Sequence, residues 1–215
     1  MAASRFCRRA MGFYSRYVLP RLIETACAQP PMMKLRERYV PQARGRVLEV
    51  GIGTGHNLAF YGADVTSVTG IDPAAELTAK ARDRASRLRV PVDVLELSGE
   101  SIPADAGSFD TIVCTWTLCS IPDPSQALRE IKRVLKADGR FIFVEHGRAD
   151  DPKLVRWQER IEPFWKRIGG GCHLSRPVDR LIEAAGLRIE HLETGHAMRG
   201  PRIATYMYHG SAVPA

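Results

Sequence analysis

The chain has 215 residues, 45% of them hydrophobic, and a formal net charge of +7. This length and apolar content predict one domain with a sizeable core, and the sequence contains no apolar run that could span a bilayer. The first 20 residues lack the apolar stretch of a secretory signal, so we expect a cytoplasmic protein. The five cysteines form no Cys-x-x-Cys pair, which indicates reduced thiols and predicts no metal site.

The N-terminal segment is strongly basic, because residues 1–46 hold ten Lys or Arg and two Asp or Glu. That charge favours an anionic partner such as a membrane surface or nucleic acid, although a solvated helical face has the same pattern. Apolar residues at helical spacing within residues 11–28 predict an amphipathic helix that Pro20 interrupts or kinks. We interpret residues 1–40 as a lid or cap with Tyr14 facing a ligand. The alternative is a helix in weak peripheral contact with a membrane.

A glycine-rich loop follows the first expected strand, within residues 47–55. An apolar run containing Glu49 ends in alternating glycines, which predicts a buried parallel strand entering a tight loop. Gly51 and Gly53 would let the backbone approach a ligand closely. The dinucleotide-binding fingerprint would require glycine at position 56, where the sequence has His56, and no Gly-Lys-Ser/Thr follows.

The second expected strand, near residues 66–71, ends in Asp72 and Pro73. Asp72 lies about 20 residues beyond the loop, the distance at which a carboxylate meets ribose hydroxyls. The loop carries Glu49 and no Lys or Arg, which suits a ligand with an ammonium and a sulfonium better than one with a pyrophosphate. These features predict an adenosine-containing, positively charged cofactor.

The remaining pattern alternates helices and strands, which predicts an α/β fold with a mostly parallel sheet covered on both faces and a ligand beyond the carboxyl ends of the strands. In chain order we expect a linker at Pro30-Pro31, a helix over 32–39, a short helix after the loop, a helix over 74–88, strands over 92–97 and 109–114, a helix over 124–135 closed by Gly139, a strand over 141–145, a helix over 177–185, and strands over 187–192 and 203–208.

Residues 147–176 break this alternation. Aromatic and basic residues, Trp165 among them, predict an inserted amphipathic helix, and three glycines ahead of Cys172 predict a flexible hinge. We interpret this insertion as a wall of the acceptor site, with plain core packing of the aromatics as the alternative.

From about residue 40 to the end, the sequence resembles the alkyl-thiol S-methyltransferases of animals, a methyltransferase-like group, and their bacterial relatives. These are class I S-adenosylmethionine (SAM) methyltransferases, and the resemblance to phospholipid and ubiquinone/menaquinone methyltransferases is more distant. The animal enzymes begin with a hydrophobic anchor, where this chain has its basic segment. The glycine loop is common to the whole class. The more specific matching segments are Val113-Cys114-Thr115, Leu118-Cys119-Ser120, Glu145-His146, and Gly171-Cys172 with Leu174-Ser175-Arg176.

The resemblance implies a Rossmann-like class I methyltransferase fold over residues 41–215, with a mostly parallel seven-stranded sheet and SAM as the cofactor. Expected substrate-pocket residues are Tyr14, Cys119, Trp165 and Cys172. The expected cofactor-binding residues are Glu49, Gly51, Gly53, Asn57, Asp72, Pro73, Gly99, Glu100, Thr115 and Trp116.

The expected acceptor is a small thiol such as hydrogen sulfide, methanethiol or another alkyl thiol. The sequence offers no strong base constellation, and a thiol needs little help because a few per cent is already ionised near neutrality. His146 is the first candidate for a base or thiolate stabiliser and His173 the second, although either could have a structural role. A phospholipid amine or a quinol precursor is the alternative acceptor. The Asn/Asp-Pro-Pro-Tyr/Phe signature of enzymes that methylate amino groups is absent after the fourth strand, which argues against nucleic acid as the acceptor.

Overall fold

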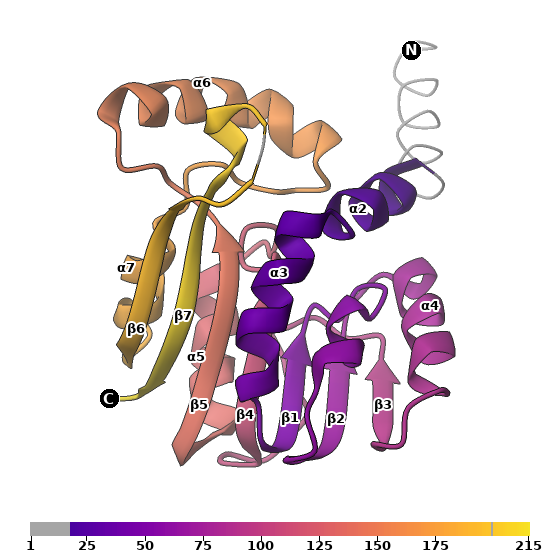
Figure 1. Ribbon diagram of the computed structural model, residues 1–215. Coiled ribbons are helices and arrows are strands. Elements are labelled where there is room, and N and C mark those ends of the chain that lie inside the picture. Colours follow the sequence, from indigo (N-terminus) through magenta and orange to yellow (C-terminus); the bar gives the residue numbers. More distant parts are fainter. Residues whose placement is uncertain (1–17, 199) are drawn as a thin grey trace, which may run out of the picture.

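The computed structural model describes residues 18–198 and 200–215. Its centre is a seven-stranded sheet in the order β3-β2-β1-β4-β5-β7-β6, in which β7 runs antiparallel to both of its neighbours and the other pairings are parallel (Figure 1). This is the predicted class I methyltransferase sheet. The strands are β1 (Gly45–Val50), β2 (Val65–Ile71), β3 (Val92–Leu95), β4 (Phe109–Thr115), β5 (Leu135–His146), β6 (Leu187–His196) and β7 (Tyr206–Pro214).

Helices cover both faces of the sheet, and two buried clusters form the core. One cluster joins the sheet to α5 and α7, and the other joins it to α3 and α4. Figure 1 shows α2 and α6 beyond the carboxyl ends of the parallel strands. The helices are α2 (Leu19–Cys27), α3 (Pro30–Tyr39), α4 (Ala75–Ala85), α5 (Pro124–Val134), α6 (Pro152–Ile168) and α7 (Val178–Ala184), with 3-10 turns η2 (Val40–Gln42), η3 (His56–Phe60) and η4 (Arg202–Ala204).

The central strands and α5 show why this sequence adopts the fold. Ile112 and Val113 of β4, like Phe141 of β5, are fully buried, as expected for strands covered on both faces. Helix α5 begins where Asp123 accepts a hydrogen bond from the backbone N–H of Gln126 at 2.9 Å. Its buried residues recur at helical spacing. Complete burial of a large apolar side chain contributes about 1.5–3 kcal/mol.

Several expected boundaries were wrong, for local reasons. Pro30 and Pro31 do not form a linker but occupy the first turn of α3, where the missing N–H has no helical partner to lose. Pro20 likewise lies in the first turn of α2. Gly139 does not cap α5, because β5 begins immediately after that helix. The last strand starts at Tyr206 because η4 precedes it.

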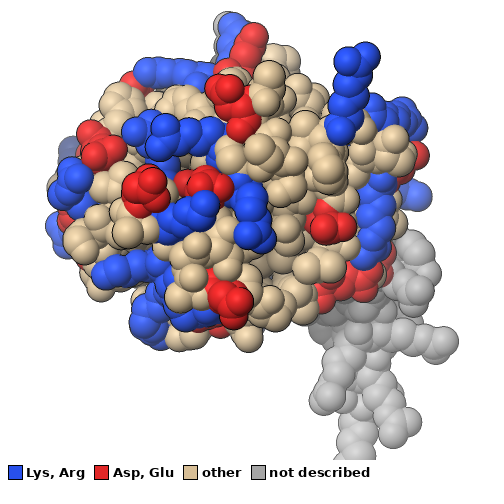
Figure 2. Space-filling model, turned by 90° about the horizontal axis from the view of Figure 1, so that it is seen from below, with Lys and Arg blue, Asp and Glu red and all other residues tan. Residues whose placement is uncertain are grey.

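The face at the opposite end of the sheet from α2 and α6 carries both signs of charge. Figure 2 shows Lys and Arg interspersed with Asp and Glu over this face. Ion pairs such as Lys136 with Asp110, at 2.6 Å, contribute to the pattern. On this view the described residues form no broad basic surface of the kind that binds a phosphate backbone.

Candidate cofactor and acceptor site

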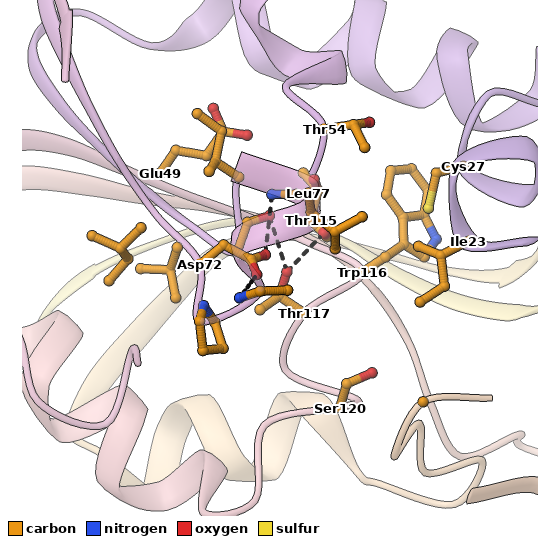
Figure 3. Close-up of a pocket in the computed structure, with 18 of the residues that line it drawn as sticks. Ile23, Cys27, Glu49, Thr54, Asp72, Leu77, Thr115, Trp116, Thr117 and Ser120 are labelled. Carbon is orange, nitrogen blue, oxygen red and sulfur yellow. Dashed lines mark hydrogen bonds between the residues drawn. The ribbon is translucent and has the colours of Figure 1, made fainter. Parts of the chain in front are cut away.

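A cavity of about 340 Å³ lies beyond the carboxyl ends of β1, β2 and β4 (Figure 3). Its position is the one that parallel α/β sheets use for ligands, and its size is within the usual range for small-molecule sites. Helix α2 and the glycine loop contribute to its walls. The predicted cofactor residues that line it are Glu49, Gly51, Gly53, Asn57, Asp72, Pro73, Gly99, Thr115 and Trp116.

Glu100 is the predicted cofactor residue that does not line this cavity. Its carboxylate accepts hydrogen bonds from the backbone N–H of Asp123 at 2.7 Å and from the Ser98 hydroxyl at 2.8 Å. Asp123 is the N-terminal cap of α5, so Glu100 holds the start of that helix in place. Ser98 and Gly99, two residues and one residue earlier, line the cavity.

The glycine loop has the backbone shape needed to hold a ligand closely. Gly51 and Gly53 have φ values of 76° and 54°, in the left-handed region that favours glycine. A Cβ on Gly51 would clash with the side chain of Thr117. A Cβ on Gly53 would meet nothing nearer than 4.0 Å, so its absence leaves open space in the cavity wall. The loop therefore fits a ligand held against the backbone at Gly53.

Asp72 joins this loop to the end of β2. Its carboxylate accepts hydrogen bonds from the backbone N–H groups of Gly53, at 3.1 Å, and Ala74, at 2.9 Å. Burial raises the pKa of Asp72, although both N–H groups favour the carboxylate form. Two carboxylate oxygens offer about four lone-pair sites, so capacity for ribose hydroxyls remains after these two bonds. Figure 3 shows Asp72 near the middle of the cavity lining.

Glu49 is buried within a polar network. Its two oxygens accept hydrogen bonds from the Asn57 side chain at 3.0 Å and from the Tyr61 hydroxyl at 2.7 Å. Burial raises the pKa of Glu49 to about 7. An adjacent positive ligand group would favour the ionised carboxylate. Arg36 extends the network, because its Nε donates to Asn57 Oδ1 at 2.9 Å.

Arg36 and His56 are cavity residues that the sequence analysis missed. Arg36 is buried on α3, and its guanidinium lies 4.5 Å from the ring centroid of Trp116. His56 Nε2 and Trp116 Nε1 are buried without a hydrogen-bond partner within the described part of the chain. Burial lowers the pKa of His56 to about 4, so the ring is neutral near pH 7. These groups are available to polar atoms of a ligand in the cavity.

Helix α2 lies along one side of the cavity. Ile23 and Cys27 are among its lining residues, and Figure 3 draws them beside Trp116. Glu24 pairs with Lys80 and Arg84 of α4, and Arg84 also donates to the carbonyl oxygen of Thr54 in the glycine loop at 2.6 Å. This part of the N-terminal segment is thus tied to the cofactor loop.

Other predictions for the N-terminal segment are not reached by the structure. Tyr14 lies outside the described residues. Among residues 18–198 and 200–215, no helix is both long and apolar enough to cross a bilayer.

Glu145, at the end of β5, positions the loop that follows β4. It is fully buried and accepts hydrogen bonds from the backbone N–H of Thr117 at 3.0 Å, from that of Cys119 at 3.4 Å, and from the Cys114 thiol at 3.4 Å. Burial raises its pKa to about 7. The sequence analysis noted Glu145 beside His146 but gave it no role. Glu145 therefore holds in place the loop that carries Trp116 and Cys119.

The predicted acceptor residues form a second group beside the cavity. Reactive side-chain atoms of Cys119, His146 and Cys172 lie within 4.8 Å of one another. The Cys119 thiol lowers the pKa of Cys172, with a contribution from the Trp165 N–H, while this contact and burial raise the pKa of Cys119 well above its usual value. The cavity lining does not include Cys119, His146, Trp165 or Cys172, but it does include Ser120, next to Cys119.

His173 is not part of this group. Its Nδ1 lies 2.9 Å from Glu162 of α6, and Glu162 also accepts hydrogen bonds from the backbone N–H and hydroxyl of Ser175. Burial lowers the pKa of His173 despite the carboxylate. These contacts anchor the glycine turn to α6, a structural role that the sequence analysis allowed for.

The strand order with an antiparallel β7, together with a glycine loop after β1 and an acidic residue after β2, is typical of a class I SAM-dependent methyltransferase. A methyltransferase domain family matches residues 48–143. The chain is 33% identical over 166 residues to the human thiol S-methyltransferase TMT1A, a match that covers 74% of this chain and 68% of that protein. The chain therefore belongs to the SAM-dependent methyltransferases, and SAM is its cofactor.

Other relatives bear on the acceptor and on the fold. Rat thiol S-methyltransferase TMT1B is 35% identical over 150 residues, which cover 68% of this chain and 62% of that protein. A phosphatidylethanolamine N-methyltransferase of Cereibacter sphaeroides is 32% identical over 157 residues, 72% of this chain and 75% of that protein. A solved geranyl diphosphate methyltransferase in complex with SAM superimposes with a TM-score of 0.68 at 13% identity, covering 86% of both chains, which supports the fold.

Proposed function

We propose that this chain transfers a methyl group from SAM to the sulfur of a small thiol, such as hydrogen sulfide, methanethiol or another alkyl thiol. The products are a methylated thiol or thioether and S-adenosylhomocysteine. Two thiol S-methyltransferases at 33% and 35% identity support this acceptor class. The chain spans 62% of the rat enzyme, so the activity of the whole relative enters here as part of the proposal.

The observation that carries the proposal is the cluster of Cys119, His146 and Cys172 beside the cavity. These residues come from the segments that give the chain its specific likeness to thiol methyltransferases. The His146 ring can accept a proton from an acceptor thiol or hydrogen-bond to its thiolate. Nearby Glu145 already receives hydrogen bonds from the loop after β4. His146 therefore remains our first candidate for proton transfer, ahead of the Glu162-paired His173.

The energetics suit an enzyme whose main task is alignment. SAM supplies, when bound, an electrophilic methyl group on a sulfonium. A thiol with a pKa of about 8.5 needs only about 2 kcal/mol to ionise fully at pH 7. Correct placement of the two reactants can supply about 7–11 kcal/mol. In this proposal the glycine loop and Asp72 hold the cofactor, α2 closes over it as a lid, and residues 147–176 form the acceptor-side wall.

A phospholipid amine is the second candidate acceptor, because the Cereibacter sphaeroides phosphatidylethanolamine N-methyltransferase is 32% identical over 75% of its length. Several large apolar side chains of α2 and α6 are also exposed near the cavity end of the molecule, including Leu22 at 53% and Phe164 at 63%. Such side chains are compatible with a lipid surface.

Methyl-labelled SAM tests the proposal with hydrogen sulfide, methanethiol and a longer alkyl thiol, each supplied alone. We expect labelled S-methyl products whose formation requires the cofactor site, so that Asp72→Ala reduces turnover on every acceptor. Negligible turnover on all thiols, alongside clear methylation of phosphatidylethanolamine or a quinol precursor, would transfer the function to the alternative.

A further inference from the structure

Three soft ligand groups from distant parts of the chain meet at one place. Cys119 follows β4, His146 is the last residue of β5, and Cys172 follows the glycine turn after α6. His146 and Cys172 are 26 positions apart, so no short spacing in the sequence reveals the cluster. We propose that these three side chains bind one thiophilic divalent cation of the Zn²⁺ type, in contrast to our expectation of no metal site.

The distances are close to those that a tetrahedral cation imposes. Bonds of about 2.3 Å to sulfur and 2.0–2.1 Å to nitrogen place neighbouring ligand atoms about 3.6–3.8 Å apart. Cys172 Sγ lies 3.7 Å from His146 Nδ1, and all three ligand atoms lie within 4.8 Å of one another. Small side-chain rotations would therefore complete the geometry without movement of the sheet.

The cluster is largely shielded from solvent. Cys119 and His146 are 3% and 5% exposed, and Cys172 is half-buried. The ligand atom of His146 is Nδ1, which faces Cys172, so two thiols and one imidazole nitrogen converge in a place largely shielded from solvent.

The backbone already holds the ligand-bearing segments together. The N–H of His173, next to Cys172, donates to the carbonyl oxygen of Cys119 at 2.7 Å. Arg176 donates to the carbonyl oxygen of Ile121 at 2.7 Å and also to that of Leu118. These contacts come from elements that exist without a cation, so the site is preorganised.

The donor set indicates which cation would bind. Two thiols and an imidazole suit Zn²⁺ and similar soft or borderline ions better than Mg²⁺ or Ca²⁺, which prefer oxygen. Three protein ligands leave one tetrahedral position for water or a small exogenous ligand. Ser120 and Gly170, near Cys119 and Cys172 in sequence, line the cofactor cavity. The cation would therefore lie just behind the cavity wall, and its binding does not depend on which acceptor the enzyme uses. With the cation bound, His146 is a ligand, so the proton-transfer role proposed above applies to the metal-free chain.

The test measures Co²⁺ and Zn²⁺ binding to the untagged, fully reduced chain, with no acceptor present. We expect one equivalent of Co²⁺ with the absorption of thiolate coordination, displaced by Zn²⁺. Cys119→Ser, His146→Gln and Cys172→Ser should each weaken Zn²⁺ binding by about 100-fold or more, since even loss of an outer partner costs 10–100-fold. Cys27→Ser is the matched control, because this cysteine lines the cavity outside the cluster, and it should bind Zn²⁺ as the unchanged chain does.

Binding of S-adenosylhomocysteine by each variant shows that a lost metal site does not reflect unfolding. Absence of stoichiometric metal in the unchanged chain would overturn the proposal and leave the cysteines as small packed side chains. Zn²⁺ affinity in the three ligand variants equal to that of the unchanged chain would also overturn it. Methyl transfer to thiols is scored separately, so the metal site and the proposed function can fail independently.

Discussion

Replacing Asp72 tests the cofactor site most sharply, because this carboxylate has two separate tasks. In the folded chain it accepts backbone hydrogen bonds from Gly53 at 3.1 Å and Ala74 at 2.9 Å. We expect its remaining lone pairs to accept ribose hydroxyls. Asp72→Ala removes both contributions, since the new side chain can neither order the glycine loop nor meet the ribose.

The expected loss follows from the number of hydrogen bonds. Each hydrogen bond to a charged group contributes about 1.5–3 kcal/mol, and a ribose offers one or two such bonds to a single carboxylate. The affinity for S-adenosylhomocysteine should therefore fall by about 1.5–6 kcal/mol, or roughly 10- to 10⁴-fold. Asp72→Asn should lose less, because its amide oxygen can still accept the hydrogen bond from Ala74.

Isothermal titration calorimetry with S-adenosylhomocysteine measures this loss. Asp93→Ala is the matched control, because Asp93 is an exposed carboxylate of β3 that does not line the cavity, and its affinity should equal that of the unchanged chain. If Asp72→Ala binds within about twofold of the unchanged chain, the ribose assignment is wrong.

Three other predictions concern pH, the lid and the base. Burial raises the pKa of Glu49 to about 7. Because the ammonium of S-adenosylhomocysteine favours the ionised carboxylate, the affinity for this ligand should rise as the pH increases through this region. Calorimetry on Glu49→Gln should show an affinity that changes less with pH. Ile23→Ser on the cavity side of α2 should raise the KM for SAM, whereas exposed Leu22→Ser should leave it unchanged; equal KM values would contradict the lid. In metal-free buffer, His146→Ala should slow thiol methylation by about 10- to 100-fold, and raising the pH toward the pKa of the thiol should restore much of the rate. A many-thousand-fold loss that pH does not rescue would instead indicate obligatory proton abstraction.

The sequence was most informative where local chemistry alone decides the structure. Gly51 and Gly53 predicted a tight loop, and both have the left-handed backbone that few other residues tolerate. Asp72 stood at the end of a recognisable strand. Apolar runs and turn residues located the strands, although boundaries moved at Gly139 and Tyr206, where neighbouring elements rather than local propensity set the ends.

Tertiary contacts explain what the sequence did not reveal. Arg36 belonged to a segment with the charge of a solvated helix, yet the packing of α3 buries its guanidinium against Trp116. Glu100 was itself predicted to bind the cofactor, but its carboxylate accepts a hydrogen bond at the start of α5. His146 and Cys172 meet because β5 and the turn after α6 come together in space, which no residue spacing encodes.

A competition experiment tests the central claim, that the acceptor is a small thiol, most directly. Methyl-labelled SAM is supplied with an alkyl thiol, phosphatidylethanolamine vesicles and a quinol precursor in one reaction, and mass spectrometry locates the label. We predict a labelled thioether formed in equal amount to S-adenosylhomocysteine, with Asp72→Ala reducing both. Label in the lipid amine or the quinol, with the thiol left unmethylated, would contradict the account.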